Sequence, residues 1–158
     1  MNSPTGQQNL AYHGAGWAKA LADECAKAVG GIHISALSML PPTPNATGHW
    51  PELWAVWCAA VQRGVRVGVW LPAPTAIHPA TKGNAGAGRR IQEAGMEIHY
   101  ITGNQLLHAK TCVIDARSVW IGSGNFTAAA SHHNHEAYLR ADCEEIARQL
   151  IQRWESLA

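Results

Sequence analysis

Six residues in the second half of the chain have the types and the spacing that phosphate chemistry needs. His108 and Lys110 are followed by Asp115 and then by Gly122-Ser123-Gly124-Asn125, which gives the pattern H-x-K-x4-D-x6-G-S-x-N. If each letter has a frequency of about 5%, a chance match in a chain of this length is on the order of one in a million. The pattern therefore indicates a functional site.

His108 and Lys110 are expected on a strand, and their spacing of two then points both side chains to one face. Histidine offers a nucleophilic ring nitrogen, and lysine offers a fixed positive charge for phosphate oxygens. Asp115 is seven positions from His108. This odd offset would place it on the opposite face, so we expect Asp115 to have a supporting role in an ion pair or a turn.

The segment Gly122–Asn125 follows another predicted strand and suits anion binding. Glycine lets the backbone come close to an anion. The Ser123 hydroxyl and the Asn125 amide can donate hydrogen bonds to that anion. Backbone N–H groups at the start of a helix expected after Phe126 would add to the same site.

This pattern resembles the signature of the phospholipase D superfamily, whose members break phosphodiester bonds through a phosphohistidine intermediate. The order of elements over residues 15–157 is also similar to that of the short bacterial endonucleases of the superfamily, which carry one motif per chain and act as homodimers. The resemblance implies that His108, Lys110, Ser123 and Asn125 are catalytic. It also implies that Glu136 holds the nucleophilic histidine by its other ring nitrogen, as the orienting acid of a triad does.

A single histidine does not easily act as both nucleophile and leaving-group acid, and a homodimer with the site at its two-fold interface removes this difficulty. One copy of His108 attacks, while the other protonates the leaving oxygen and later activates water. The two histidines then titrate as a coupled pair, which predicts a bell-shaped rate profile. Paired Lys110 and Asn125 side chains stabilise the transition state electrostatically, so we expect no metal and no other cofactor.

The elements that must position these residues alternate along the chain. Its 158 residues suit one domain, and the 47% apolar residues provide a core. Helices are expected at 17–29, 51–63, 82–94 and 143–157, and strands at 32–40, 65–71, 96–101, 106–115, 118–122 and 136–141. This order predicts an α/β phospholipase D-like domain, a central mixed β-sheet with helices on both faces. Residues 1–14 are expected to be a flexible N-terminal arm and residues 15–158 a single catalytic domain.

The charge balance does not identify a polyanionic partner. Twelve Lys and Arg against eleven Asp and Glu give a net charge of +1, well below the excess of a strongly basic nucleic-acid-binding protein. A local group of cations is still compatible with this balance. We expect Lys82, Arg89 and Arg90, around a glycine-rich helix start, and His49, beside the loop after the first strand, to be candidates for substrate binding.

Three other features have structural interpretations. The four cysteines are far apart, which predicts free thiols. The histidines of the segment 132–135 lack nearby Cys or Asp ligands, so a polar loop is favoured over a metal site. Trp50, Trp54 and Trp57 form a helical stripe, for which we expect core or dimer-interface packing, with Trp50 as a stacking platform for bases as the alternative.

The sequence has no apolar stretch of about 18 residues and no signal peptide, so we expect a cytoplasmic protein with no stable membrane association. The favoured function is a metal-independent phosphodiesterase, a non-specific endonuclease on DNA or RNA. A phospholipid hydrolase or phosphatidyl transferase is one alternative. A non-catalytic nucleic-acid-binding subunit of a larger complex is the other.

Overall fold

The computed structural model describes residues 10–14, 16–75 and 77–158. The strands are β1 (Leu10–His13), β2 (Gly31–Ser35), β3 (Arg66–Pro72), β4 (Glu97–Ile101), β5 (Lys110–Ile114), β6 (Ser118–Gly122) and β7 (Ala137–Asp142). The helices are α1 (Gly16–Cys25), α2 (His49–Gln62), the short 3-10 helix η1 (Pro79–Thr81), α3 (Asn84–Glu93), α4 (Ala128–His132) and α5 (Glu144–Glu155).

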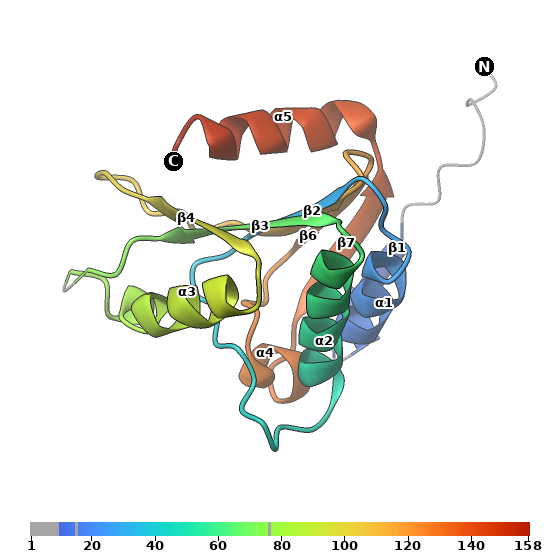
Figure 1. Cartoon of the computed structure of the whole chain (residues 1–158), viewed down its shortest axis with the longest axis horizontal. Coiled ribbons are helices and arrows are strands. Elements are labelled where there is room, and N and C mark those ends of the chain that lie inside the picture. Colours follow the sequence, from blue (N-terminus) through green and yellow to red (C-terminus); the bar gives the residue numbers. More distant parts are fainter. Residues whose placement is uncertain (1–9, 15, 76) are drawn as a thin grey trace.

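All seven strands join one sheet in the order β1-β7-β6-β5-β2-β3-β4. β2, β3 and β4 are parallel, because helices α2 and α3 return the chain between them. β5, β6, β7 and β1 continue the sheet in antiparallel fashion. Helices α1 to α4 cover one face and α5 covers the other, as Figure 1 shows. The predicted mixed sheet with helices on both faces is confirmed.

Aromatic side chains dominate the core between the sheet and helices α1 and α2. Phe126 is fully buried, and its ring centroid lies 5.3 Å from that of Trp57 and 5.9 Å from that of Trp17. Trp50 is 1% exposed and donates a hydrogen bond from Nε1 to the Leu40 carbonyl. The tryptophan stripe of α2 is therefore core, and the alternative of Trp50 as a base-stacking platform is wrong.

A smaller core lies under α5 on the opposite face. Trp154 of α5 is 2% exposed and lies 5.8 Å from Trp70 of β3, measured between ring centroids. The other buried members of this cluster are Ile101, Val113, Val119 and Ala147. The single helix α5 thus stabilises this face of the sheet with one apolar side and turns its charged residues outward.

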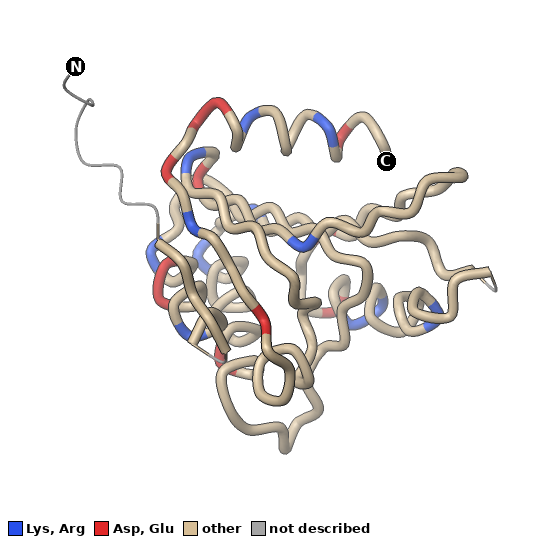
Figure 2. Tube along the Cα trace, turned by 180° about the vertical axis from the view of Figure 1, so that it is seen from behind, with Lys and Arg blue, Asp and Glu red and all other residues tan. Residues whose placement is uncertain are grey.

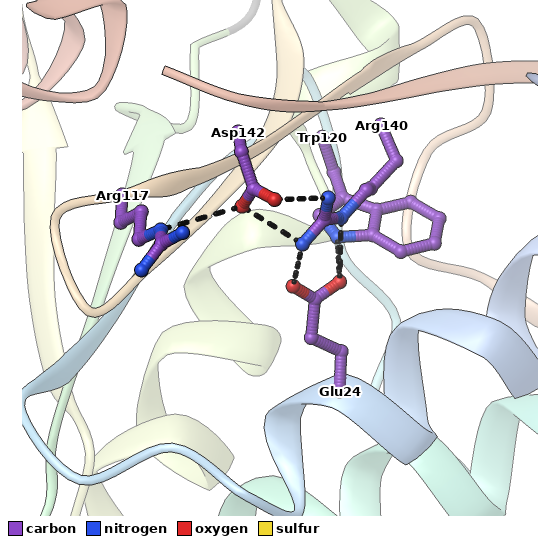
Figure 3. Close-up of polar contacts among 5 residues, drawn as sticks. All are labelled: Glu24, Arg117, Trp120, Arg140 and Asp142. Atoms are coloured by element: carbon purple, nitrogen blue, oxygen red, sulfur yellow. Dashed lines mark hydrogen bonds and ion pairs between the residues drawn. The ribbon is translucent and has the colours of Figure 1, made fainter. Parts of the chain in front are cut away.

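A network of charged groups ties α1 to the antiparallel half of the sheet (Figure 3). Arg140 of β7 donates to both Glu24 of α1 and Asp142, each at 2.8 Å, and Trp120 of β6 donates to Glu24 at 2.8 Å. Burial alone would raise the pKa of Glu24, but these donors outweigh it and lower that pKa below its usual value. The network therefore holds α1 against β6 and β7.

The expected N-terminal arm is partly wrong. Residues 1–9 lie outside the described residues, but Leu10–His13 form β1, which pairs antiparallel with β7. The pairing satisfies the backbone groups of β7 on that side, which explains why this short segment adopts extended structure. The helix expected at 17–29 also ends earlier, at Cys25.

Two predicted strands are shorter than expected. The strand expected at 32–40 ends at Ser35. The residues after it approach the segment that follows β6, where the backbone N–H of Leu40 donates to the Phe126 carbonyl at 3.1 Å. The strand expected at 106–115 begins only at Lys110. Its ladder with β2 stops at the pair Ser35 and Thr111, so β2 offers no partner to the residues before Lys110.

Other expectations concern the cysteines and the membrane. Cys25, Cys58, Cys112 and Cys143 are all free, as predicted, and Cys25 and Cys112 are buried. None of the helices in the described ranges is long and apolar enough to cross a membrane.

Replacing Phe126 by alanine should lower the free energy of unfolding by roughly 3–5 kcal/mol, because the cavity would lie among tryptophans that cannot collapse into it. Urea denaturation followed by fluorescence measures the change. Val29→Ala, at a position that is 84% exposed, is the control and should stay within about 0.5 kcal/mol of wild type. A loss below about 1 kcal/mol for Phe126→Ala would contradict this packing.

Candidate active site

The antiparallel strands bring the motif to one edge of the sheet. Lys110, the first residue of β5, pairs with Gly122, the last residue of β6, and Gly122 pairs with Tyr138 near the start of β7. The segments before β5, after β6 and before β7 therefore emerge side by side. They carry His108, Ser123 to Asn125, and Glu136.

His108 and Lys110 are in direct contact. Lys110 Nζ lies 3.0 Å from His108 Nδ1 and 3.4 Å from Nε2, and it donates to the His108 carbonyl at 2.7 Å. His108 is exposed and precedes β5. The prediction that His108 and Lys110 are neighbours on one face of a strand is therefore wrong. The two meet because Lys110 folds back over the loop. A neutral imidazole keeps one ring nitrogen with the lone pair that a nucleophile needs.

Lys110 is a buried cation, with 6% of its surface exposed. Burial lowers the pKa of Lys110 from its usual value, and the negative charge of Glu136 opposes this by raising it. The site holds a desolvated positive charge directly beside an exposed histidine, which is a suitable arrangement for a phosphate.

Glu136 binds the glycine-rich segment. Its Oε2 accepts a hydrogen bond from the Ser123 hydroxyl, and its Oε1 accepts one from Asn134 Nδ2 at 3.0 Å. Ser123 Oγ in turn accepts from Ala137 N at 3.1 Å. Within the described parts of the chain, no hydrogen bond joins Glu136 to His108, so the orienting contact implied by the resemblance is not formed in this single chain.

Side chains within the same chain pack so closely against Gly122 and Gly124 that a larger residue would not fit there. A Cβ on Gly122 would lie 2.4 Å from the ring of Tyr138, and one on Gly124 would lie 3.1 Å from Cγ of Glu136. The Tyr138 hydroxyl donates to the Gly124 carbonyl, and burial raises the pKa of Tyr138. Tyr138 thus shapes the site, and the sequence analysis missed it. Its signal was an aromatic residue alternating with exposed Ala137 and Leu139 in β7.

Asn125 connects the motif to the loop 36–48 after β2. Its Oδ1 accepts from Ser38 N at 3.2 Å, which leaves the NH2 end of the amide as the donor. Ser38 also escaped the sequence analysis, because a backbone N–H has no signature in sequence. This contact and the burial of Phe126 fix Asn125 from both sides.

Asp115 lies at the far end of β5 from Lys110. Its carboxylate accepts from the backbone N–H groups of Val29 at 3.1 Å, Gly30 at 2.6 Å and Gly31 at 3.0 Å. Asp115 itself has a φ of 53°, a left-handed conformation that Asp and Asn tolerate better than most residues. These contacts fix the turn where β2 begins, which is what a supporting role requires.

The expected substrate-binding residues do not form one group. Arg90 donates to the carbonyls of Pro41 at 2.6 Å and Pro42 at 2.5 Å, so it supports the loop 36–48. His49 Nδ1 lies 3.1 Å from Glu52 Oε2. Lys82 and Arg89 are exposed, and Figure 2 shows the Lys and Arg positions dispersed over the described chain.

The histidine segment 132–135 carries no metal-ligand cluster. No group of three or more His, Cys, Asp or Glu side chains suited to a metal occurs among the residues with a described position. His132 Nε2 instead lies 3.1 Å from the Thr47 carbonyl, and a Cβ on Gly48 would overlap its ring. This histidine joins α4 to the loop 36–48.

Comparison with known families gives one match that covers most of the chain. Residues 31–158 match the family described as cardiolipin synthase, PLD-like domain. Among curated proteins, phospholipase D of Rickettsia typhi is 31% identical over 64 residues, and that of Rickettsia conorii is 33% identical over 64 residues. The match covers 40% of this chain and 31% and 32% of those proteins, respectively.

Solved structures resemble most of the chain in fold. Nuc from Salmonella typhimurium, a phospholipase D family member, superposes with a TM-score of 0.77 at 19% identity, covering 96% of this chain and 94% of Nuc. NucT from Helicobacter pylori gives 0.72 at 14% identity, with 96% of both chains covered. Phosphatidylserine synthase from Haemophilus influenzae gives 0.67 at 13% identity, but this chain covers only 40% of it.

Asp115→Asn should lower the free energy of unfolding by about 1 kcal/mol, because asparagine tolerates the left-handed backbone but accepts fewer hydrogen bonds. Asp115→Ala should lower the free energy of unfolding further, by about 2–3 kcal/mol, because alanine accepts no side-chain hydrogen bond and tolerates the left-handed backbone less well. Urea denaturation compares the two variants. Equal stability of wild type and Asp115→Ala would contradict the supporting role of Asp115.

Proposed function

We propose that this chain, which belongs to the phospholipase D superfamily, is a metal-independent phosphodiesterase that cleaves nucleic acid as a homodimer. The observation that carries the proposal is the contact between exposed His108 and buried Lys110, 3.0 Å apart at the sheet edge. The same proposal takes residues 15–158 as one catalytic domain.

In the first step, a ring nitrogen of His108 attacks phosphorus and forms a P–N bond, while the P–O bond to the leaving group breaks. Lys110 stabilises the negative charge that grows on the phosphate oxygens. When Lys110 turns its ammonium to the phosphate, His108 Nδ1 becomes available to Glu136. Glu136 then orients the ring and stabilises its positive charge, the role that the resemblance implies.

The leaving oxygen takes its proton from a second histidine, His108 of the partner subunit. In the second step water attacks phosphorus, gives its proton to that same histidine and breaks the P–N bond, which restores the resting enzyme. A two-fold axis at the sheet edge supplies the second histidine without any further residue.

Ser123 and Asn125 have different parts in this scheme. The Ser123 hydroxyl donates to Glu136 and so positions that carboxylate rather than the phosphate. Asn125, whose oxygen end is held by Ser38, presents its NH2 end as a donor to a phosphate oxygen. Ser123 is therefore proposed as a positioning residue and Asn125 as a phosphate-binding one.

Nucleic acid is the favoured substrate because the fold matches 94% of Nuc and 96% of NucT. This supports the resemblance to the short endonucleases. The second candidate is a phospholipid hydrolase or phosphatidyl transferase, favoured by the family description and by the Rickettsia phospholipases D. Because this chain spans about a third of those proteins, they support this candidate less.

Cleavage should proceed in EDTA, and His108→Ala should reduce it about a thousandfold or more, because the nucleophile is lost. Wild type and variant are incubated with single-stranded DNA, duplex DNA, RNA and phosphatidylcholine vesicles. Lys27→Ala, at an exposed position near Asp115 and thus at the opposite end of β5, is the control and should match wild type. Dependence on Mg²⁺ would contradict the mechanism, and product from vesicles alone would favour the lipid candidate.

Mixed dimers test the shared site. After subunit exchange with a roughly ninefold excess of His108→Ala, the activity per wild-type subunit should fall about tenfold, since most wild-type subunits then lack a second histidine. Activity read immediately after mixing, before exchange, controls for substrate sequestration by the variant. Unchanged activity after exchange would show that each subunit acts alone.

A further inference from the structure

A cavity of about 480 Å³ opens beside His108, between the β4–β5 loop and α5. Its volume lies in the range typical of small-ligand sites, about 300–1,000 Å³. His108 itself lines the cavity, so any group bound there sits next to the proposed reacting phosphate. Neither the mechanism above nor the motif uses the other lining residues.

The walls of the cavity are apolar. Leu106 and Leu107 come from the β4–β5 loop, and Leu150 and Leu157 come from the last turns of α5 and the residues after it. Trp154, buried against Trp70, closes the inner end. Such walls suit the faces of a flat, weakly hydrated group.

The rim of the cavity is polar and carries no acidic side chain. Asn104 and Gln105 are exposed and line it, and each side-chain amide both donates and accepts hydrogen bonds. Arg153 also lines the cavity and brings a positive charge to it. Amides pair with the polar edges of bases, and a guanidinium pairs with a phosphate, whereas an acyl chain uses neither.

We propose that this cavity binds one unpaired nucleobase adjacent to the phosphate at His108. The inference rests on the proposed function and names its substrate class as single-stranded nucleic acid. A base within a duplex is stacked and paired, so it cannot enter without being unstacked at a cost. A single strand offers the base directly, with its neighbouring phosphate near Arg153.

The test compares two hexamers with the same number of phosphodiesters, a thymidylate hexamer and one in which tetrahydrofuran replaces every nucleoside. Wild type should cleave the thymidylate hexamer with a kcat/KM about tenfold higher or more, the usual effect of binding one base. Leu150→Trp fills the cavity and should remove this preference while leaving cleavage of the abasic hexamer unchanged. Ile146→Trp, on an exposed position of α5 outside the cavity, should behave as wild type.

An equal kcat/KM of wild type for the thymidylate and the abasic hexamer would overturn the inference. A Leu150→Trp variant whose kcat/KM falls equally for both hexamers would overturn it as well. A loss on phosphatidylcholine vesicles alone would assign the cavity to an acyl chain instead. If Leu150→Trp fails to fold by circular dichroism, Asn104→Ala at the exposed rim replaces it, with a partial loss of the preference expected.

Binding separates failure of this inference from failure of the proposed function. Fluorescence anisotropy gives the Kd of a labelled thymidylate hexamer in the His108→Ala background, with and without Leu150→Trp, so that the hexamer is not cleaved during the titration. Weaker binding by Leu150→Trp, with no turnover by wild type, supports the base site and contradicts the phosphodiesterase. Equal Kd values, or no binding by either, contradict the base site.

Discussion

The register that aligns Lys110, Gly122 and Tyr138 across three antiparallel strands is the constraint on which the site depends. It places the start of β5, the end of β6 and the start of β7 at one edge. Tyr138 lies over the bare Cα of Gly122 and donates to the Gly124 carbonyl, so side-chain packing reinforces this register. A shift of one residue would turn the Lys110 side chain to the other face of the sheet.

Electrostatics then gives this edge its chemistry. A buried ammonium is costly unless it has partners. The Lys110 ammonium donates to the His108 carbonyl and is stabilised by the negative charge of Glu136. A bound phosphate would stabilise this ammonium more strongly. The site is thus set for an anion before any anion binds. Phe126, fixed among tryptophans, and Ser38 hold Asn125 in place on the same edge.

Much of this architecture could be predicted from the sequence, because hydrophobic patterning and glycine positions are local signals. The mixed sheet, the core role of the tryptophan stripe and the free cysteines followed from such patterns. The true start of β5 could not, since it depends on where its neighbours β2 and β6 end. Likewise, the bond from the Ser38 backbone N–H to the Asn125 side chain depends on the tertiary fold, and so do the bonds of the Tyr138 and Arg90 side chains to backbone carbonyls.

The central claim is that His108 is the nucleophile, and trapping the covalent intermediate tests it most directly. Wild type is mixed with a cleavable oligonucleotide in EDTA and quenched in alkali, in which a phosphohistidine survives, and its peptides are analysed by mass spectrometry. We expect a nucleotidyl adduct, joined through phosphorus, on His108 of wild type and none in His108→Ala. Cleavage without any adduct on His108, or an adduct on another residue, would contradict this claim.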